Sequence, residues 1–291
     1  MTAAPPFAAR LRDAVAAAGS ALCVGLDPDP DRLPAPFAGR AEDPAAAAEF
    51  CVAITEHTAS VAAAFKPNLA FFEAYGPDGW DALAAVCRAV RRSGRLLVLD
   101  GKRGDIGNTG RRYAAALYDR LGADAATVAP YMGADSVAPF LEHGGRCAFV
   151  LVATSNPGAA DLQHLDVRAP AGAASGGASG GEAGPLYQTV AERAAEAERG
   201  RPGEVGFVVG ATRPALLADL RRRHPLVPFL VPGVGVQGGS AADVLGANAG
   251  GPLLVNASRS VLYAASGPDY LRAAADAAAA LAGSLAGAAG R

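Results

Sequence analysis

The sequence predicts one (β/α)8 TIM barrel, an α/β fold, forming a single domain over residues 1–291. The chain has 291 residues, which suits one such barrel because the fold typically needs ~250. Eight short apolar runs recur along the chain, as expected for strands that are buried on both faces of a parallel sheet. Helix-sized segments lie between them. Eight strand–helix repeats favour a closed barrel over the alternative, an open doubly wound sheet.

Local signals place the expected strands and helices. The eight apolar runs are Ala21–Leu26, Val61–Lys66, Leu96–Asp100, Ala125–Ala129, Cys147–Ala153, Val205–Val209, Phe229–Val231 and Leu253–Asn256. Asp43 followed by Pro44 predicts a helix start, because Asp caps helices and Pro is favoured at the first helical position. A second helix, over residues 78–93, should stop at Gly94. The remaining helices are expected over residues 110–121, 136–143, 186–199, 214–223, 241–245 and 268–282.

One segment interrupts this rhythm. Residues 168–184 read RAPAGAASGGASGGEAG, a low-complexity composition. Such a segment buries too little side chain to offset its ordering entropy. We interpret it as a mobile surface insertion between the fifth strand and its helix, and a lid over the barrel is the alternative.

Charge and cysteine content narrow the class of protein. The net charge of −2 gives no global positive field that would attract nucleic acid or an anionic membrane. The run Arg221–Arg223 ends an expected helix, where cations complement the helix dipole, so we interpret it as a solvated helix terminus. The four cysteines lie far apart in apolar stretches. They are expected to be buried free thiols in a reducing compartment.

No targeting or membrane segment is expected. The N-terminal residues lack the charged start and unbroken apolar core of a signal peptide. The stretch Ala277–Ala289 consists mostly of Ala and Gly, which are too weakly apolar for a membrane span. The sequence therefore predicts a cytoplasmic protein.

Charged residues crowd together where the third expected strand ends. Asp100, Lys102 and Asp105 follow the apolar residues of that strand, and Asp100 and Lys102 point to the same side of an extended chain. Lys66 ends the second strand, from which it could reach Asp100. Barrel enzymes keep their active sites at this end of their strands. We therefore expect an alternating array of these four charges, with a salt-bridged loop on the rim as the alternative.

The last two expected strands are followed by a candidate anion site. Residues 231–239 read VPGVGVQGG, and residues 256–260 read NASRS. Backbone N–H groups of a Gly-rich turn and a helix start, together with Arg259, can hold a phosphate dianion. Barrels often bind phosphate with this pair of loops.

These motifs resemble those of the orotidine 5'-phosphate decarboxylases, in particular the longer bacterial type. DGKRGDIGNT is similar to the family's Asp-x-Lys-x-x-Asp signature, and further blocks match: FKPNLAFFEAYG, VAPYMG, VATSNPGAADLQ, VVGAT and PGVGVQGG. The resemblance runs from Val24 to Arg259 and leaves out the two termini and the insertion. It implies a homodimeric barrel that converts orotidine 5'-phosphate to UMP, the last step of de novo pyrimidine synthesis, without metal or cofactor.

The resemblance also implies a role for each site residue. Lys102 would protonate C6 of the pyrimidine, flanked by Asp100 and Asp105, and Lys66 would complete the charged network. Asp105 and Thr109 would act in the partner subunit's site. Four further residues would bind the substrate: Asp27 at a ribose hydroxyl, Ser155 at the pyrimidine ring, Gln237 at the phosphate and base, and Arg259 at the phosphate.

Two other functions stay open at this point. Related sugar-phosphate decarboxylases and hexulose phosphate synthases share the Asp-x-Lys-x-x-Asp pattern but use Mg2+, held partly by a carboxylate at the end of the second strand. Lys66 stands at that position here, and a cation there repels Mg2+. A non-catalytic barrel that only binds a phosphorylated ligand is the second alternative, since fold does not imply activity.

Overall fold

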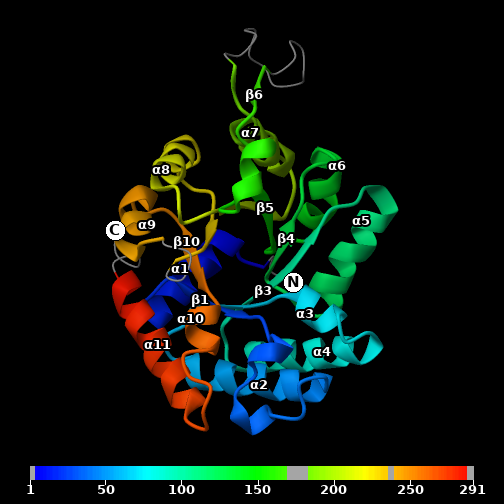
Figure 1. Ribbon diagram of the computed structural model, residues 1–291. Coiled ribbons are helices and arrows are strands. Elements are labelled where there is room, and N and C mark those ends of the chain that lie inside the picture. Colours follow the sequence, from blue (N-terminus) through cyan, green and yellow to red (C-terminus); the bar gives the residue numbers. More distant parts are fainter. Residues whose placement is uncertain (1–3, 169–182, 235–238, 287–291) are drawn as a thin grey trace.

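A computed structural model describes residues 4–168, 183–234 and 239–286. Eight strands form a closed barrel in the order β1-β10-β9-β8-β5-β4-β3-β2 (Figure 1). Each neighbouring pair in the barrel is parallel. All eight strands coincide with predicted apolar runs, which confirms the (β/α)8 barrel. They are β1 (Leu22–Leu26), β2 (Ala64–Pro67), β3 (Leu96–Arg103), β4 (Ala125–Val128), β5 (Cys147–Ala153), β8 (Glu204–Val209), β9 (Phe229–Pro232) and β10 (Leu253–Ala257).

Helices surround the barrel (Figure 1). They are α1 (Phe7–Ala18), α2 (Pro44–Thr58), α3 (Leu69–Glu73), α4 (Pro77–Arg92), α5 (Gly107–Ala114), α6 (Ala134–Val137), α7 (Leu186–Glu198), α8 (Pro214–Arg223), α9 (Ala241–Asn248), α10 (Arg259–Leu262) and α11 (Tyr270–Leu285). A π-helical segment, η3 (Ala115–Arg120), continues α5, and shorter 3-10 turns are η1 (Pro30–Arg32), η2 (Ala35–Phe37), η4 (Ala138–Glu142) and η5 (Pro157–Asp161). Within the described parts of the chain, we find no helix with the length and apolar character to cross a membrane.

The start of α2 and the end of α4 lie where capping residues in the sequence predicted them. Asp43 caps α2 as predicted, because its side chain accepts a hydrogen bond from the backbone N–H of Ala45 at 2.9 Å, and Pro44 is the first helical residue. Helix α4 ends just before Gly94, which has φ of 73°, a conformation that favours glycine.

Helix α1 closes the N-terminal end of the barrel. Its first residue, Phe7, is fully buried and meets the ring of Phe149 edge-on at 5.8 Å. Pro6, which precedes the helix, offers no side-chain cap. The carboxylate of Glu204, at the start of β8, instead accepts hydrogen bonds from the backbone N–H groups of Phe7 and Ala8. A tertiary contact thus supplies the cap that the local sequence lacks.

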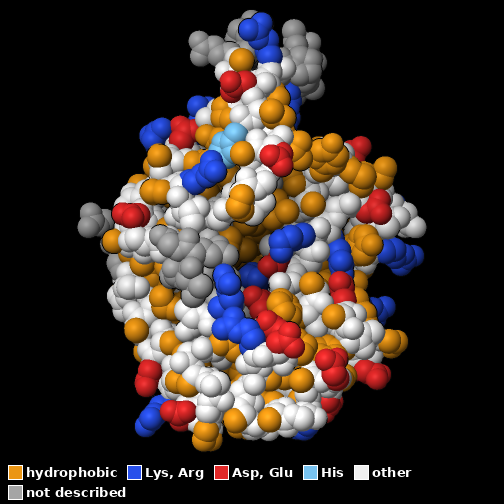
Figure 2. All heavy atoms as spheres, viewed as in Figure 1, with side chains coloured by type: hydrophobic (Ala, Val, Ile, Leu, Met, Phe, Trp, Pro, Cys, Tyr) orange, Lys and Arg blue, Asp and Glu red, His pale blue; other side chains and the backbone are white. Residues whose placement is uncertain are grey.

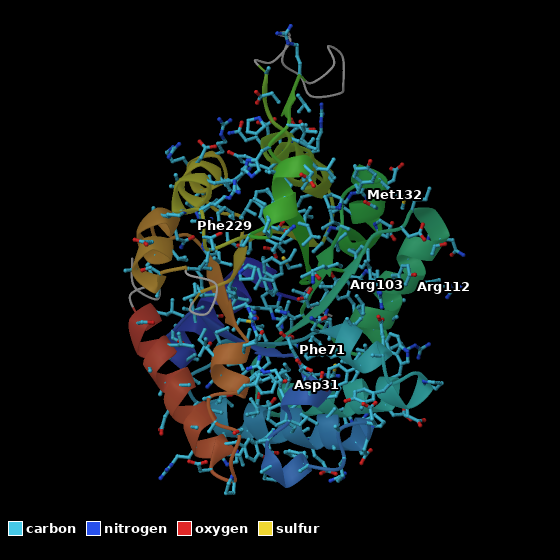
Figure 3. All side chains as sticks on the ribbon, viewed as in Figure 1. Asp31, Phe71, Arg103, Arg112, Met132 and Phe229 are labelled. Atoms are coloured by element: carbon cyan, nitrogen blue, oxygen red, sulfur yellow. The ribbon has the colours of Figure 1, made fainter. Side chains whose placement is uncertain are left out.

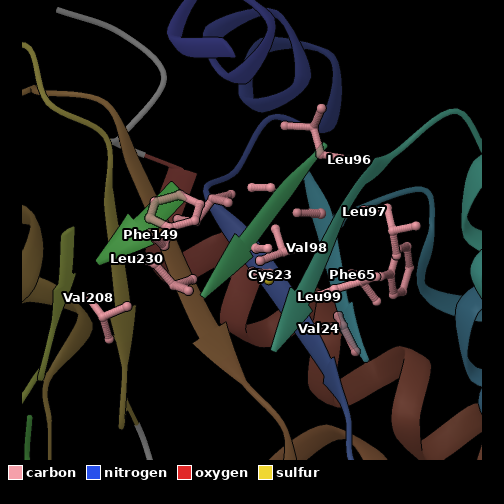
Figure 4. Packing of buried hydrophobic residues seen from close by; sticks show 14 of the residues in the cluster. Cys23, Val24, Phe65, Leu96, Leu97, Val98, Leu99, Phe149, Val208 and Leu230 are labelled. Atoms are coloured by element: carbon pink, nitrogen blue, oxygen red, sulfur yellow. The ribbon is translucent and has the colours of Figure 1, made fainter. Parts of the chain in front are cut away.

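Apolar side chains fill the barrel and the layer between strands and helices. Figure 4 shows core residues from the strands, among them Val24, Phe65, Val98 and Leu230, which are at most 2% exposed. Continuous burial along β1 explains why this strand reads as an unbroken apolar run. The four cysteines are buried and free, as predicted.

The predicted insertion begins and ends at a small pair of strands. β6 (Asp166–Val167) and β7 (Gly184–Pro185) pair antiparallel between β5 and α7. They project beyond the rim of the barrel at the top of Figure 1. Two-residue strands carry no periodic signal, so the sequence did not predict them. The interior of the insertion, residues 169–182, lies outside the described residues.

The interpretation of Arg221–Arg223 as a solvated helix terminus is wrong for Arg221. This side chain is 4% exposed, lies over the ring of Phe229 and donates two hydrogen bonds to Asn248 Oδ1, at 3.1 and 2.8 Å. Burial lowers the pKa of the guanidinium to about 10. Arg221 also holds the loops that precede β9 and β10, by donating to the carbonyls of His224, Pro225, Val227 and Pro252.

Candidate active site

The C-terminal ends of β2 and β3 carry a network of charged side chains. Asp100 lies between two ammonium groups: its Oδ2 is 2.6 Å from Lys66 Nζ, and its Oδ1 is 2.7 Å from Lys102 Nζ. Thr127 in β4 donates a hydrogen bond to Asp100 Oδ1 at 2.8 Å and accepts one from the Lys102 backbone N–H at 2.9 Å. The side chains of Lys66 and Asp100 are 5% and 11% exposed, whereas that of Lys102 is 51% exposed. The network is therefore anchored inside the barrel and opens to its mouth at Lys102.

Strand register and an unusual backbone angle create this network. A bridge between Asn68 and Asp100 extends the parallel pairing of β2 and β3, which brings the end of β2 beside Asp100. β3 runs to Arg103, past its predicted end, with a register shift against β4 after Leu99. Lys102 has φ of 45°, a left-handed conformation that is uncommon outside glycine. This backbone, together with the contact to Thr127, fixes the direction in which the Lys102 ammonium points.

The two lysines of the network are the only lysines in the sequence. The chain has 26 Lys and Arg residues, and all except Lys66 and Lys102 are arginines. An ammonium group can give up a proton, whereas a guanidinium in a protein effectively cannot. Both side-chain ammonium groups of the chain therefore lie in this one network.

Opposite charges keep the two buried members of the network ionised. Burial by itself raises the pKa of Asp100, but Lys66 and Lys102 outweigh burial and hold the pKa of this carboxyl well below its usual range. Burial likewise lowers the pKa of Lys66, yet Asp100 and Asp27 together raise it above the ordinary lysine value. Asp100 and Lys66 are therefore both charged at neutral pH.

A pocket with a volume of about 210 Å³ lies against the network. Asp27 Oδ1 and Asn256 Oδ1 are buried beside it, and neither has a hydrogen-bond partner among the described residues. Figure 2 shows acidic and basic side chains gathered in the central hollow of this face of the barrel. The lining residues are Asp27, Lys66, Asn68 and Asp100 on one side and residues 232–234 and 256–260 on the other.

Arg259, the arginine of the predicted anion site, lines this pocket. It is the first residue of α10, its side chain is exposed, and it lines the same pocket as Lys66 and Asp100. The neighbouring Ser258 approaches β1 so closely that a Cβ on Gly25 would lie 1.9 Å from Ser258 Oγ. The structure thus brings Asp27, Lys66, Asp100 and Arg259 together around one pocket.

Asp105 and Thr109 do not line this pocket. Asp105 Oδ1 accepts a hydrogen bond from the backbone N–H of Ile106 at 2.8 Å. Among the described residues, the lysines form their ion pairs with Asp100 and not with Asp105. Thr109 is exposed in the first turn of α5. Within one chain, the predicted array of four charges therefore contains three.

Two further predicted residues, Ser155 and Gln237, have different outcomes. Ser155 follows β5, and its Oγ is buried without a hydrogen-bond partner among the described residues. It faces the residue after β8, because a Cβ on Gly210 would lie 2.1 Å from Ser155 Oγ. Ser155 is therefore at the same end of the barrel, although it does not line the pocket. Gln237 lies outside the described residues, so its predicted role stays a prediction.

Sequence reasoning assigned no role to two polar residues, Thr127 and Asn256. Thr127 holds Asp100 and the Lys102 backbone, and Asn256 lines the pocket. Each interrupts an otherwise apolar strand, in AATV and LLVNA respectively. A polar side chain inside a buried strand needs a partner, and that interruption is the signal that could have identified both residues.

Fold and site together define a (β/α)8 barrel with a Lys–Asp–Lys network at the C-terminal end of its strands, beside a pocket lined by an arginine. The chain belongs to the orotidine 5'-phosphate decarboxylase / HUMPS family, whose sequence model matches residues 20–275. This match confirms the resemblance found in the sequence motifs.

Individual relatives cover nearly the same part of the chain. The orotidine 5'-phosphate decarboxylase of Roseiflexus castenholzii is 47% identical, over 88% of each chain. That of Herpetosiphon aurantiacus is 43% identical, over 92% of this chain and 93% of the relative. Among solved structures, Leishmania donovani OMP decarboxylase superposes with a TM-score of 0.77 at 40% identity, covering 97% of this chain and 99% of that chain. Leishmania donovani UMP synthase gives a TM-score of 0.80 at 41% identity, with 98% of this chain but 56% of that chain covered.

Proposed function

We propose that this chain decarboxylates orotidine 5'-phosphate to UMP and that Lys102 supplies the proton which replaces the carboxylate at C6. The observation that carries the proposal is the ion pair that holds the half-exposed Lys102 ammonium beside Asp100, a carboxylate that a second, buried lysine keeps ionised. The curated relatives that are 43% and 47% identical bear the name of this enzyme. Lys66, in the place where metal-dependent relatives need a carboxylate, favours this reaction over a Mg2+-dependent one.

The residue types suit the chemistry of this reaction. Loss of CO2 breaks the bond between C6 and the carboxylate and leaves the electron pair on a ring carbon that delocalises it poorly. A fixed ammonium beside C6 stabilises the developing negative charge. Lys102 Nζ then gives a proton to C6, becomes a neutral amine, and regains a proton from solvent. Asp100 holds the Lys102 ammonium beside C6 until the proton is transferred, and its charge favours the return of a proton to the amine.

The pocket provides groups that suit the remainder of the substrate. Arg259 and the loop residues beside it are placed to bind the phosphate. Asp27 Oδ1, which is buried and unpartnered among the described residues, is suited to accept a hydrogen bond from a ribose hydroxyl. Ser155 and Gln237 would bind the pyrimidine and the phosphate. This scheme uses side chains of the protein alone and assigns no step to a metal or an organic cofactor.

We further propose a homodimer in which Asp105 and Thr109 complete the partner's site. The loops after β3 and β4 expose apolar side chains near these residues: Ile106 is 50%, Tyr131 87% and Met132 48% exposed. Figure 3 shows Met132 on the same side of the mouth as Arg103 and Arg112, which belong to β3 and α5. Gathered exposed apolar side chains typically mark an interface. The cytoplasmic location stays a prediction from the sequence.

The first test follows the ultraviolet absorbance change of orotidine 5'-phosphate in the presence of EDTA. We expect turnover by the wild type and a loss of roughly 10³-fold or more in Lys102→Ala, because both charge stabilisation and proton donation are removed. Arg272→Ala is the matched control, since it removes one positive charge from a side chain that is 79% exposed on α11. No turnover by the folded wild type would redirect the search to sugar-phosphate substrates with Mg2+, and then to UMP binding without turnover.

The second test separates action within one subunit from action across the dimer. Lys102→Ala and Asp105→Ala protomers are each expected to be inactive alone. Equal mixing with free exchange makes half of the dimers mixed, each with one intact site of two, so about a quarter of the wild-type activity should return. If subunit exchange is confirmed and no activity returns, Asp105 does not act across the interface.

A further inference from the structure

A second charged pocket lies at the opposite, N-terminal end of the barrel. It has a volume of about 420 Å³, and its charged lining residues are Arg10, Arg91, Arg95, Arg146 and Asp124. Arg95 directly precedes β3, Asp124 precedes β4 and Arg146 precedes β5. Neighbouring parallel strands begin at the same end of a barrel, so these three side chains converge there. Arg10 reaches them from α1, which closes that end.

The pocket has a large excess of positive charge. Asp124 is the one carboxylate among its described lining residues, and both of its oxygens are already engaged. Oδ1 pairs with Arg10 and, at 3.0 Å, with Arg146, while Oδ2 accepts a hydrogen bond from the Leu97 backbone N–H at 2.8 Å. Four guanidinium groups against one carboxylate leave a formal charge of +3.

Arg91 and Arg95 have no protein counter-ion among the described residues. The carboxylate of the pocket pairs with Arg10 and Arg146 instead. Arg95 Nε is buried without a hydrogen-bond partner in that part of the chain, and a buried N–H group of this kind costs free energy until something accepts its hydrogen bond. The guanidinium of Arg91 lies against Gly122, where a Cβ would be 2.6 Å from Arg91 Nη1. The glycine thus makes room for a guanidinium to reach the pocket.

A purely structural ion cluster does not explain this arrangement. At the N-terminal face of a barrel, charged residues commonly serve stability, and such clusters balance their charges. Elsewhere in this chain they do so: Arg222 and Arg223 pair with Asp219 and Glu192. The N-terminal pocket instead gathers four like charges around one shared carboxylate, which is unfavourable unless an anion joins them.

We propose that this pocket binds a nucleoside polyphosphate. Guanidinium groups form paired hydrogen bonds with phosphate oxygens, and their planar faces stack on aromatic rings such as nucleobases. The excess of +3 complements the several negative charges of a di- or triphosphate chain. The pocket's volume of about 420 Å³ lies within the range of ~300–1,000 Å³ that is typical of small-molecule sites.

The test is isothermal titration calorimetry with ATP and with pyrophosphate, without Mg2+ and with excess UMP present to occupy the other pocket. We expect the wild type to bind one ATP per chain and Arg91→Glu to bind it at least about tenfold more weakly, because a charge-assisted contact is lost and a repulsive charge is added. Arg272→Glu makes the same change of charge on the outer surface of α11, and its affinity for ATP should equal that of the wild type.

Gly144→Glu is the second variant, and it keeps every arginine. A Cβ at this lining residue would make an ordinary contact with Pro202 at 3.6 Å, so the fold should tolerate the change. The added carboxylate should weaken ATP binding as Arg91→Glu does. Pyrophosphate that binds as tightly as ATP would overturn the nucleoside part of the proposal. Absence of ATP binding, or an ATP affinity that neither variant changes, would overturn the site.

Discussion

Replacing Asp100 by Asn removes the charge at the centre of the network while keeping the shape of the side chain. Lys66, whose side chain is 5% exposed, then loses the carboxylate that lies 2.6 Å from its Nζ. Removing one partner of a buried ion pair typically costs about 3–5 kcal/mol. Asp27 also stabilises the charge of Lys66, which favours the lower end of that range. The half-exposed pair with Lys102 adds up to ~1 kcal/mol. The expected loss, about 4 kcal/mol, is a large part of the ~5–15 kcal/mol by which domains are stable.

Reversible urea unfolding, followed by circular dichroism at neutral pH, measures this loss. The informative comparison is the double variant Lys66→Met/Asp100→Asn, in which the buried ammonium is absent. We expect it to be more stable than Asp100→Asn alone, because an uncompensated buried charge costs more than the missing ion pair contributes. A loss below about 1 kcal/mol in Asp100→Asn, or a double variant that is less stable than it, would refute the reasoning.

Three further predictions follow from the described contacts. Because the pKa of Asp100 is lowered in the folded protein, its contribution to stability is complete above about pH 4 and is lost as the pH falls further. Because the pKa of Lys66 is raised, its contribution to stability is complete below about pH 10 and is lost as the pH rises. The midpoints of urea unfolding, measured across this pH range, check both predictions. If the midpoint of Asp100→Asn falls at acid pH as steeply as that of the wild type, the prediction for Asp100 is contradicted. Arg221→Met leaves buried carbonyl groups without donors and should lower the free energy of unfolding by about 2–4 kcal/mol, while a change under ~0.5 kcal/mol would argue against the structural role of this residue. Gly25→Ala places a Cβ 1.9 Å from Ser258 Oγ and should raise KM about tenfold or more. The double variant Gly25→Ala/Ser258→Gly should recover most of that loss, and an unchanged KM in the single variant would show that this contact does not shape the site.

The barrel could be predicted from the sequence because its strands are buried on both faces. Each strand then reads as a short apolar run, and the eight runs agree with the eight barrel strands. The ends of strands were less accurate, since pairing continues where the apolar pattern stops. β3 runs through Asp100 to Arg103 because the backbone hydrogen bonds, and not the side chains, define its end.

The sequence revealed only some of the tertiary partners of the polar side chains. Three charged residues of the site were predicted to meet because they end neighbouring strands, and they do. The contact that orients two of them comes from Thr127, a residue in a third strand. Arg221 was misread for the same reason: its position at a helix end suggests solvent, but Asn248 and the ring of Phe229 enclose it. Local patterns predict elements, whereas the partners of a polar side chain depend on the packing of distant ones.

Because both lysines belong to one network, a reagent that modifies side-chain amines reacts with this chain at one place only. A reagent that acylates side-chain amines has two targets in the whole sequence, and both belong to the candidate site. Their accessibilities differ about tenfold, with 51% exposure for the side chain of Lys102 and 5% for that of Lys66. A dye or affinity tag attached through a lysine would therefore label the candidate site at Lys102, and protection of that amine by a ligand would report directly on occupation of the barrel mouth.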